Sequence, residues 1–147
     1  LTFDWLPVAM VAIDYIYIYI CICICIYCWG PSMEPTLYTN DMVFAETISR
    51  RLFRINRGDV VVVCNPMDPH TQICKRVIGM EGDIVCTNNK FPIGHVWLEG
   101  DNMEHSSDSR LYGPVPYALI RSRVVWKVSN FWSSLHEFDE LFDVYSK

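Results

Sequence analysis

The chain has 147 residues, enough for one compact domain with a core and one additional segment. Its net charge is -5, and its 12 Lys and Arg residues are scattered rather than gathered in a block. Proteins that bind the phosphate backbone carry a clustered basic surface, so nucleic acid is excluded as an expected partner.

Residues 1–29 are predicted to form a transmembrane anchor. Residues 6–29 are apolar or aromatic except for Asp14, and ~20 helical residues suffice to cross a bilayer core. The Asp14 carboxylate opposes insertion by ~2.5–3.5 kcal/mol, which the isoleucines offset at ~0.3–0.6 kcal/mol each. Over residues 16–26, Ile alternates with Tyr and then Cys, which is typical of a translated dinucleotide repeat and also compatible with a strand. We favour a membrane helix because the alternation produces no polar face.

The seven cysteines are interpreted as ordinary apolar residues without a redox or metal role. Cys25 and Cys28 form a CxxC pattern, but no strand-loop-helix context surrounds it. Cys64, Cys74 and Cys86 lie far apart and lack zinc-type spacing. The sequence therefore predicts neither a metal nor a cofactor.

Residues 30–130 have the local pattern of a mainly β domain. Short runs rich in β-branched and apolar residues are predicted to be strands at 60–64, 73–78, 84–86, 96–98 and 124–128. Gly, Asp and Pro residues separate these runs as tight turns would. Residues 131–147 are predicted to be an amphipathic C-terminal helix that closes over the sheet, because apolar residues recur there every three or four positions.

A candidate nucleophile, Ser32, follows the hydrophobic segment directly. It lies in the block GPSMEPTL, where two prolines and a glycine stiffen the loop and hold the hydroxyl at a fixed angle. Taken alone, the block also fits an ordinary turn. A serine hydroxyl is a poor nucleophile until a neighbouring base takes its proton, so the serine requires a partner.

Lys75 is the candidate base. In the predicted strand 73–78 side chains alternate, so Lys75 shares a face with Ile73 and Val77 while Arg76 points to the other face. An ammonium group on an apolar surface loses hydration, which lowers its pKa toward the range that suits a general base. By itself Lys75 also fits a snorkelling lysine on an edge strand. Together, Ser32 and Lys75 supply the parts of a Ser/Lys dyad, in which lysine replaces histidine.

A third polar block, GDNMEHSSDSR, occupies residues 100–110. Its Asp101, Asp108 and Arg110 are predicted to form an ion-pair cluster that fixes the loop. The Ser106 hydroxyl is predicted to orient the lysine amine. Without the other blocks, this segment would be interpreted as a polar turn.

These three blocks, in this order, resemble the type I signal peptidase family (peptidase S26). SMEPTL is similar to the nucleophile box, RGDVVVV to the first core strand, KRVIGMEGD to the lysine box, and GDN with SSDSR and YGPVP to the last box. The similarity spans residues 30–123. Within the family it is greatest to the mitochondrial inner membrane peptidases, subunit 1, through GPSMEPT, DMVFAE, ICKRVIG and GHVWLEGDN.

The resemblance implies a twisted antiparallel β domain beside a membrane. It implies a serine endopeptidase of the mitochondrial inner membrane, facing the intermembrane space, that removes N-terminal sorting or signal presequences and acts with a second homologous subunit. Ser32 would be the nucleophile and an oxyanion donor, Lys75 the general base and Ser106 its helper. The residues expected to support this site are Met33, Asp101, Asp108 and Arg110.

Other functions fit parts of the same pattern. A catalytically silent subunit would bind presequences or act as a scaffold for an active partner. A self-cleaving repressor shares the Ser/Lys chemistry, but no DNA-binding module precedes Ser32. A histidine-based serine protease is disfavoured because no GxSxG occurs. Many bacterial signal peptidases have a hydroxyl residue where this chain has Gly30, so the Ser32 backbone N–H would carry more of the oxyanion role.

Overall fold

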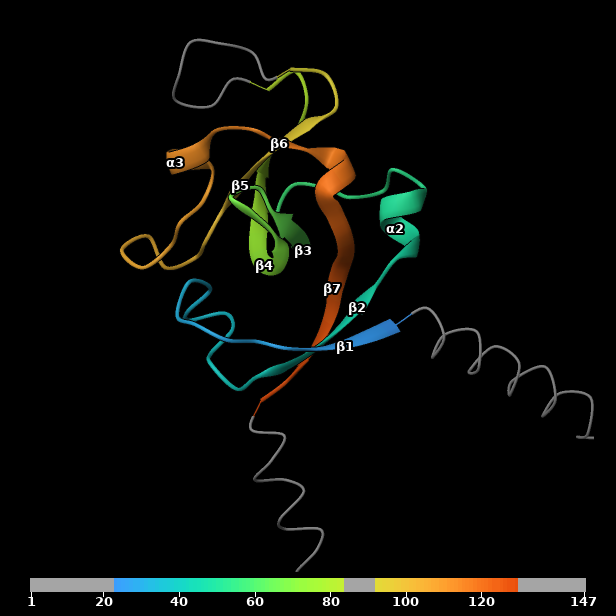
Figure 1. Ribbon diagram of the computed structural model, residues 1–147. Coiled ribbons are helices and arrows are strands. Elements are labelled where there is room, and N and C mark those ends of the chain that lie inside the picture. The colour runs from blue at the N-terminus through green and yellow to red at the C-terminus, as the bar shows by residue number, and fades with distance from the viewer. Residues whose placement is uncertain (1–22, 84–91, 130–147) are drawn as a thin grey trace, which may run out of the picture.

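The computed structural model describes residues 23–83 and 92–129, which form a twisted antiparallel sheet (Figure 1). Within these residues the strands follow the spatial order β1-β2-β7-β3-β4-β5-β6. Their bounds are β1 Cys23–Tyr27, β2 Met42–Glu46, β3 Val60–Asn65, β4 Asp68–Gly79, β5 His95–Glu99, β6 Val115–Pro116 and β7 Ile120–Val128. The connections contain the short helices α2 Ile48–Arg51, α3 Ser109–Tyr112 and the 3-10 helix η1 Tyr117–Leu119.

The predicted mainly β fold is confirmed, and so are most of the predicted strands. The runs 60–64, 73–78, 96–98 and 124–128 lie inside β3, β4, β5 and β7. The continuous apolar run of β3 is buried from residue 61 to residue 64, as expected for a strand covered on both faces. The predicted strand 84–86 and the predicted helix 131–147 lie outside the described residues.

The predicted membrane helix is wrong for the last part of segment 1–29, because Cys23–Tyr27 forms strand β1 at the edge of the sheet. β1 pairs antiparallel with β2, from Cys23 opposite Glu46 to Tyr27 opposite Met42. This pairing satisfies the backbone groups that a helix would have satisfied internally. Residues 1–22 lie outside the described part, and none of the described helices is long and apolar enough to cross a bilayer.

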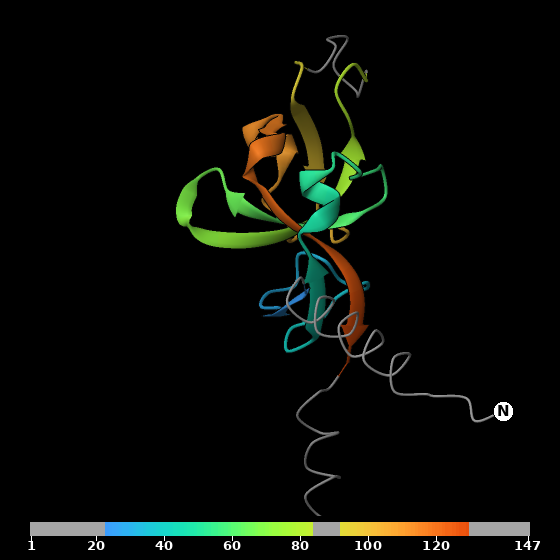
Figure 2. The same ribbon diagram turned by 90° about the vertical axis from the view of Figure 1, so that its right-hand side faces the viewer.

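Two apolar clusters fill the space around the β3–β4 hairpin. One is built around Val61, Val63 and Val77, and the other around Met33, Leu37 and Val43. Because side chains alternate along a strand, β3 contributes to both clusters from its two faces. Figure 2 shows the β3–β4 hairpin extending away from β2 and β7, and residues of β4 also belong to both clusters.

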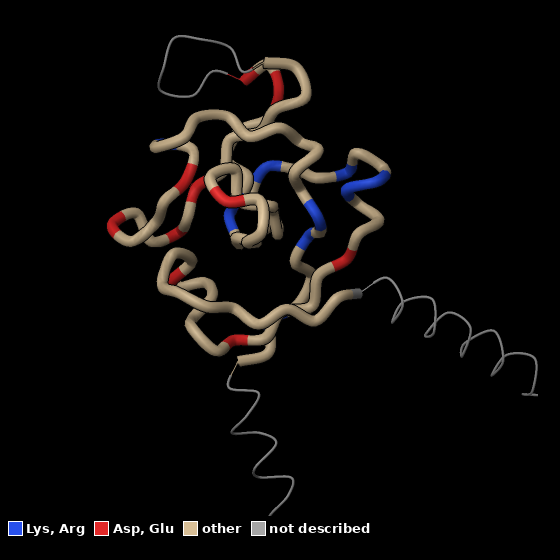
Figure 3. The backbone as a smooth tube through the Cα atoms, viewed as in Figure 1, with Lys and Arg blue, Asp and Glu red and all other residues tan. Residues whose placement is uncertain are grey.

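The charged residues are unevenly distributed over the described domain. Figure 3 shows basic residues gathered around α2 and the neighbouring part of the sheet, and acidic residues mainly along the loops. The α2 region contributes Arg50, Arg51 and Arg54. None of these three arginines belongs to the described lining of the cavity beside Ser32.

Candidate active site

The structure brings Ser32 and Lys75 into contact. Lys75 Nζ donates a hydrogen bond to Ser32 Oγ over 2.8 Å. Lys75 lies on β4 and is only 3% exposed, whereas Ser32 is half-buried in the loop between β1 and β2. The alternation predicted for β4 is confirmed, because Val77 is buried with Lys75 while the Arg76 side chain extends to Asp101.

The surroundings of Lys75 favour its neutral form. Burial lowers the pKa of the Lys75 amine below its ordinary value, although the nearby Asp108 carboxylate acts in the opposite direction. A lowered pKa increases the fraction of neutral amine at physiological pH. A neutral amine within hydrogen-bonding distance of a hydroxyl can accept its proton, which is the arrangement that nucleophilic catalysis requires.

The loop that carries Ser32 is fixed by its backbone and by one buried side chain. Asn102 N–H donates to the Ser32 carbonyl oxygen over 3.1 Å, and Leu37 N–H donates to that of Met33 over 2.9 Å. Met33 is 3% exposed and packs against Leu37 and Val43. The Met33 side chain therefore anchors the residue that follows Ser32 in the core.

Gly100 lies where the Ser32 loop meets the loop that follows β5. A Cβ atom at this position would collide with the Ser32 carbonyl oxygen and with Ser106 Oγ, and it would lie 2.6 Å from Ser106 Cβ. Residues with a side chain therefore do not fit without displacing one of these groups. Gly100 was not predicted as a site residue, although its position at the start of the GDN block could have indicated this role.

Asp108 organises the loop between β5 and α3. Its carboxylate is 1% exposed and accepts hydrogen bonds from Ser106 Oγ over 2.7 Å and from Gly100 N–H over 2.9 Å. It also forms an ion pair with Arg110, 2.6 Å from Arg110 Nη2. Burial alone would raise the pKa of Asp108, but the hydrogen bonds from Arg110, Gly100 and Ser106 outweigh it and hold the pKa well below its usual range. The charge of Asp108 is therefore fixed near Lys75.

Asp101 belongs to a separate ion pair, not to the single predicted cluster with Asp108 and Arg110. Arg76 donates to both Asp101 carboxylate oxygens, over 2.8 and 2.6 Å, and Thr36 Oγ1 also hydrogen-bonds to Asp101. The strand register explains this, because Arg76 on β4 lies opposite Glu99, close to Asp101 in sequence.

Two residues that were not predicted as site residues thus connect the three blocks. Thr36 lies in the Ser32 loop and Arg76 follows Lys75, and both contact Asp101 after β5. Their signal in the sequence was only their position inside the nucleophile and lysine blocks. These contacts hold the loop that carries Ser32 against the strand that carries Lys75.

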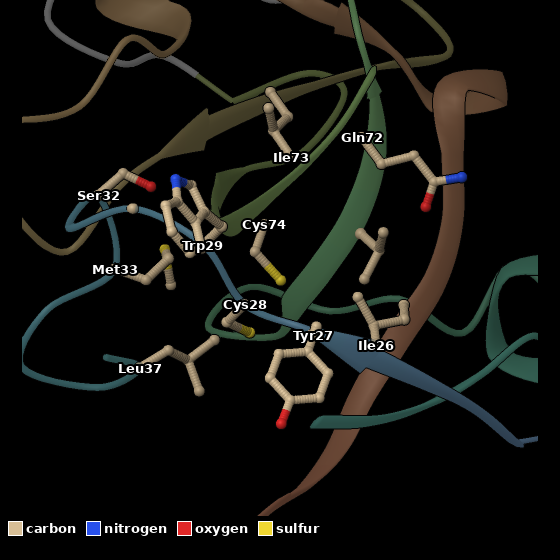
Figure 4. Close-up of a pocket in the computed structure, with 12 residues that line it drawn as sticks. Ile26, Tyr27, Cys28, Trp29, Ser32, Met33, Leu37, Gln72, Ile73 and Cys74 are labelled. Atoms are coloured by element: carbon tan, nitrogen blue, oxygen red, sulfur yellow. The ribbon is translucent and has the colours of Figure 1, made fainter. Parts of the chain in front are cut away.

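A cavity of about 160 Å³ lies beside Ser32 (Figure 4). Ile26 and Trp29 from the β1 end, Met33 from the Ser32 loop, and Ile73 and Cys74 from β4 belong to its lining, and none of the described lining residues is charged. This cavity suits a small uncharged group beside the Ser32 hydroxyl.

Comparison with known sequences identifies the family. The family described as "Signal peptidase, peptidase S26" matches residues 2–91 and 87–129. The chain belongs to the signal peptidase family. The resemblance predicted from the sequence blocks is thereby confirmed.

Three relatives of this signal peptidase homologue show the range of similarity. Mitochondrial inner membrane protease subunit 1 of Homo sapiens is 52% identical over 116 residues, covering 71% of this chain and 70% of the relative. Subunit 1 of Schizosaccharomyces pombe is 46% identical over 108 residues, covering 67% and 69%. Mitochondrial inner membrane protease subunit 2 of Danio rerio is 39% identical over 116 residues, covering 69% and 63%.

Proposed function

We propose that this member of the signal peptidase family is a serine endopeptidase that removes N-terminal sorting or signal presequences with a Ser32/Lys75 dyad. The 2.8 Å contact between Lys75 Nζ and Ser32 Oγ is the observation that carries the proposal. Ser32 Oγ attacks the scissile carbonyl carbon while the neutral Lys75 amine takes the hydroxyl proton. Lys75 then gives this proton to the leaving amine, and an acyl-enzyme remains on Ser32. In the second half-reaction Lys75 takes a proton from water, and the resulting hydroxide attacks the acyl carbonyl carbon. The ester bond to Ser32 Oγ then breaks, and Lys75 returns the proton to this oxygen.

The groups around the dyad have positioning roles in this proposal. Ser106 Oγ donates a hydrogen bond to Asp108, which leaves the lone pairs of the hydroxyl free to accept one. Among the described contacts the Lys75 amine bonds to Ser32 and not to Ser106, so the role of Ser106 in orienting the amine rests on the family resemblance. The backbone N–H of Ser32 stabilises the oxyanion, because Gly30 offers no side-chain donor.

The cavity beside Ser32 supports a preference for small uncharged residues before the cleavage site. Its volume is about 160 Å³, and the lining residues within 23–83 and 92–129 include no ionised group that would pair with a charged side chain. A large or charged substrate residue at this place would lose hydration without gaining a partner.

The relatives supply the cellular setting of the proposal. Several are named mitochondrial inner membrane protease, and both subunit 1 and subunit 2 occur among them. We therefore place the chain at the mitochondrial inner membrane, with its catalytic domain facing the intermembrane space. Its substrates are presequences of proteins delivered to that space, and its partner is a second homologous subunit.

A single-turnover assay with the full chain in detergent and a synthetic presequence tests the dyad. Ser32→Ala and Lys75→Met are each expected to lower the cleavage rate by about 10³-fold or more. Ser107→Ala, which changes an exposed serine of the neighbouring loop, is the matched control and should cleave normally. Full cleavage by either dyad variant would rule the mechanism out. Presequence binding without cleavage by the unmodified chain would instead favour a catalytically silent subunit.

A further inference from the structure

Cys28 and Cys74, which the sequence analysis treated as ordinary apolar residues, come from distant segments and meet in the lining of the cavity beside Ser32. Both pack against the cluster of Met33, Leu37 and Val43. Figure 4 shows the Cys28 and Cys74 side chains next to each other in this part of the cavity. Both are free thiols and half-buried. The cysteine that pairs with Cys28 is therefore Cys74, not its CxxC neighbour Cys25.

We propose that Cys28 and Cys74 form a reversible disulfide that slows peptide cleavage by displacing the segment that carries Ser32. The inhibitory part of this proposal rests on the proposed function, whereas formation of the bond does not. A disulfide needs two thiols on neighbouring segments, and these two cysteines line the same cavity and pack against the same cluster.

The positions of the two cysteines connect the bond to the dyad. Cys74 directly precedes Lys75 on β4 and lies opposite Val62 of β3, so it is held inside the sheet. Cys28 lies just before Gly30 and Ser32 in the sequence, and its backbone is held by the segment at residues 40 and 41, through hydrogen bonds of 2.9 and 3.0 Å. The two sulfur atoms must approach to about 2.05 Å to form a bond. Closing this bond pulls the Cys28 segment toward β4, and the pull acts through residues 29–31 against the hydrogen bond from Asn102 N–H that holds Ser32.

The oxidation can proceed by exchange with a small-molecule disulfide such as oxidised glutathione. The neighbouring Cys74 thiol lowers the pKa of Cys28, although burial and Asp41 oppose it, so Cys28 is the attacking thiolate. It attacks one glutathione sulfur, the S–S bond breaks, and one glutathione thiolate leaves and is protonated. Cys74 then loses its proton and attacks the Cys28 sulfur, and the second glutathione leaves. Two cysteine thiols are oxidised and one glutathione disulfide is reduced to two thiols.

The test treats the full chain with oxidised glutathione and follows two readouts. Mass spectrometry of the unreduced digest should find the Cys28–Cys74 cross-linked peptide, whether or not the chain is active. The presequence cleavage rate should fall by about 10- to 100-fold, the effect of a displacement near 1 Å at a catalytic group, and dithiothreitol should restore it.

Substitutions identify the cysteines responsible. For Cys28→Ala and Cys74→Ala, the cleavage rate after oxidised glutathione divided by the rate after dithiothreitol should stay near one. If Cys74→Ala does not fold, Cys74→Val replaces it in this measurement. Cys25→Ala changes an exposed cysteine of β1 and should keep the full response. Absence of the cross-link, an unchanged rate with the cross-link formed, or inhibition that persists in the Cys74 variants would each overturn the proposal. Cleavage by Ser32→Ala would reject the proposed function and leave the cross-link result standing.

Discussion

Replacement of Gly100 by alanine tests how closely the loops of the site must pack. The new methyl carbon would lie 2.6 Å from Ser106 Cβ and would also collide with the Ser32 carbonyl oxygen. Carbon atoms in ordinary contact are about 3.5–4.0 Å apart, so the loops must separate by about 1 Å. Ser32 is joined to the same loop through Asn102 N–H, and it therefore shifts relative to Lys75.

The expected result of Gly100→Ala is a large loss of rate with a smaller loss of stability. A misplacement near 1 Å lowers the cleavage rate by about 10²-fold, and overpacking destabilises the fold by about 1–3 kcal/mol. Single-turnover cleavage of a presequence and urea unfolding of the same preparation measure the two effects.

Gly94→Ala is the matched control for Gly100→Ala. Gly94 has a φ of 72°, and no heavy atom lies within 4 Å of the place that a Cβ atom would take. Alanine there costs about 1–2 kcal/mol in backbone strain without touching the site. This variant should cleave at the normal rate. If Gly100→Ala folds and cleaves within twofold of the unmodified chain, the argument that Gly100 positions Ser32 is wrong.

Three further predictions concern charge and pH. The kcat/KM for presequence cleavage should rise with pH as the Lys75 amine loses its proton, with a midpoint below pH 10.5 because burial lowers the pKa of this amine. A kcat/KM that falls as the pH rises toward 10.5 would contradict the role of Lys75 as base. Between the lowered pKa of Lys75 in the folded chain and 10.5, the unfolded chain binds more protons than the folded chain, so the free energy of unfolding measured in urea should rise with pH. Lys75→Met should be more stable than the unmodified chain near neutral pH and should lack this pH dependence. Asp108→Asn should lose about 1–3 kcal/mol, because the carboxylate that pairs with Arg110 is replaced by a neutral amide whose nitrogen cannot accept a hydrogen bond from the loop. The stability that the lowered pKa of Asp108 provides is present above about pH 4 and is lost as the pH falls through the folded pKa, so acid unfolding of Asp108→Asn should lack this component.

The amino-acid sequence alone is enough to predict β3, most of β4 and β5, part of β7, and the contact between Ser32 and Lys75. The four consecutive valines of β3 predict a buried strand because their stiff β-branched side chains favour extended backbone in any context. Alternation along β4 placed Lys75 on the apolar face and Arg76 on the other, since a strand has a period of two. The order of the three blocks identified the family, which the family comparison confirmed.

The tertiary structure, and not the local sequence pattern, determines which distant residues come into contact. Cys23–Tyr27 is a strand because β2 offers its edge as a partner, and an apolar run by itself does not distinguish this strand from a helix. Arg76 takes Asp101 away from the predicted cluster because the register of β4 and β5 brings them together. Gly100 must lack a side chain because the Ser32 loop and the loop after β5 pack against each other there. Cys28 lies beside Cys74 because the segment after β1 packs against β4. Such contacts depend on the three-dimensional path of the chain, which local propensity and periodicity do not specify.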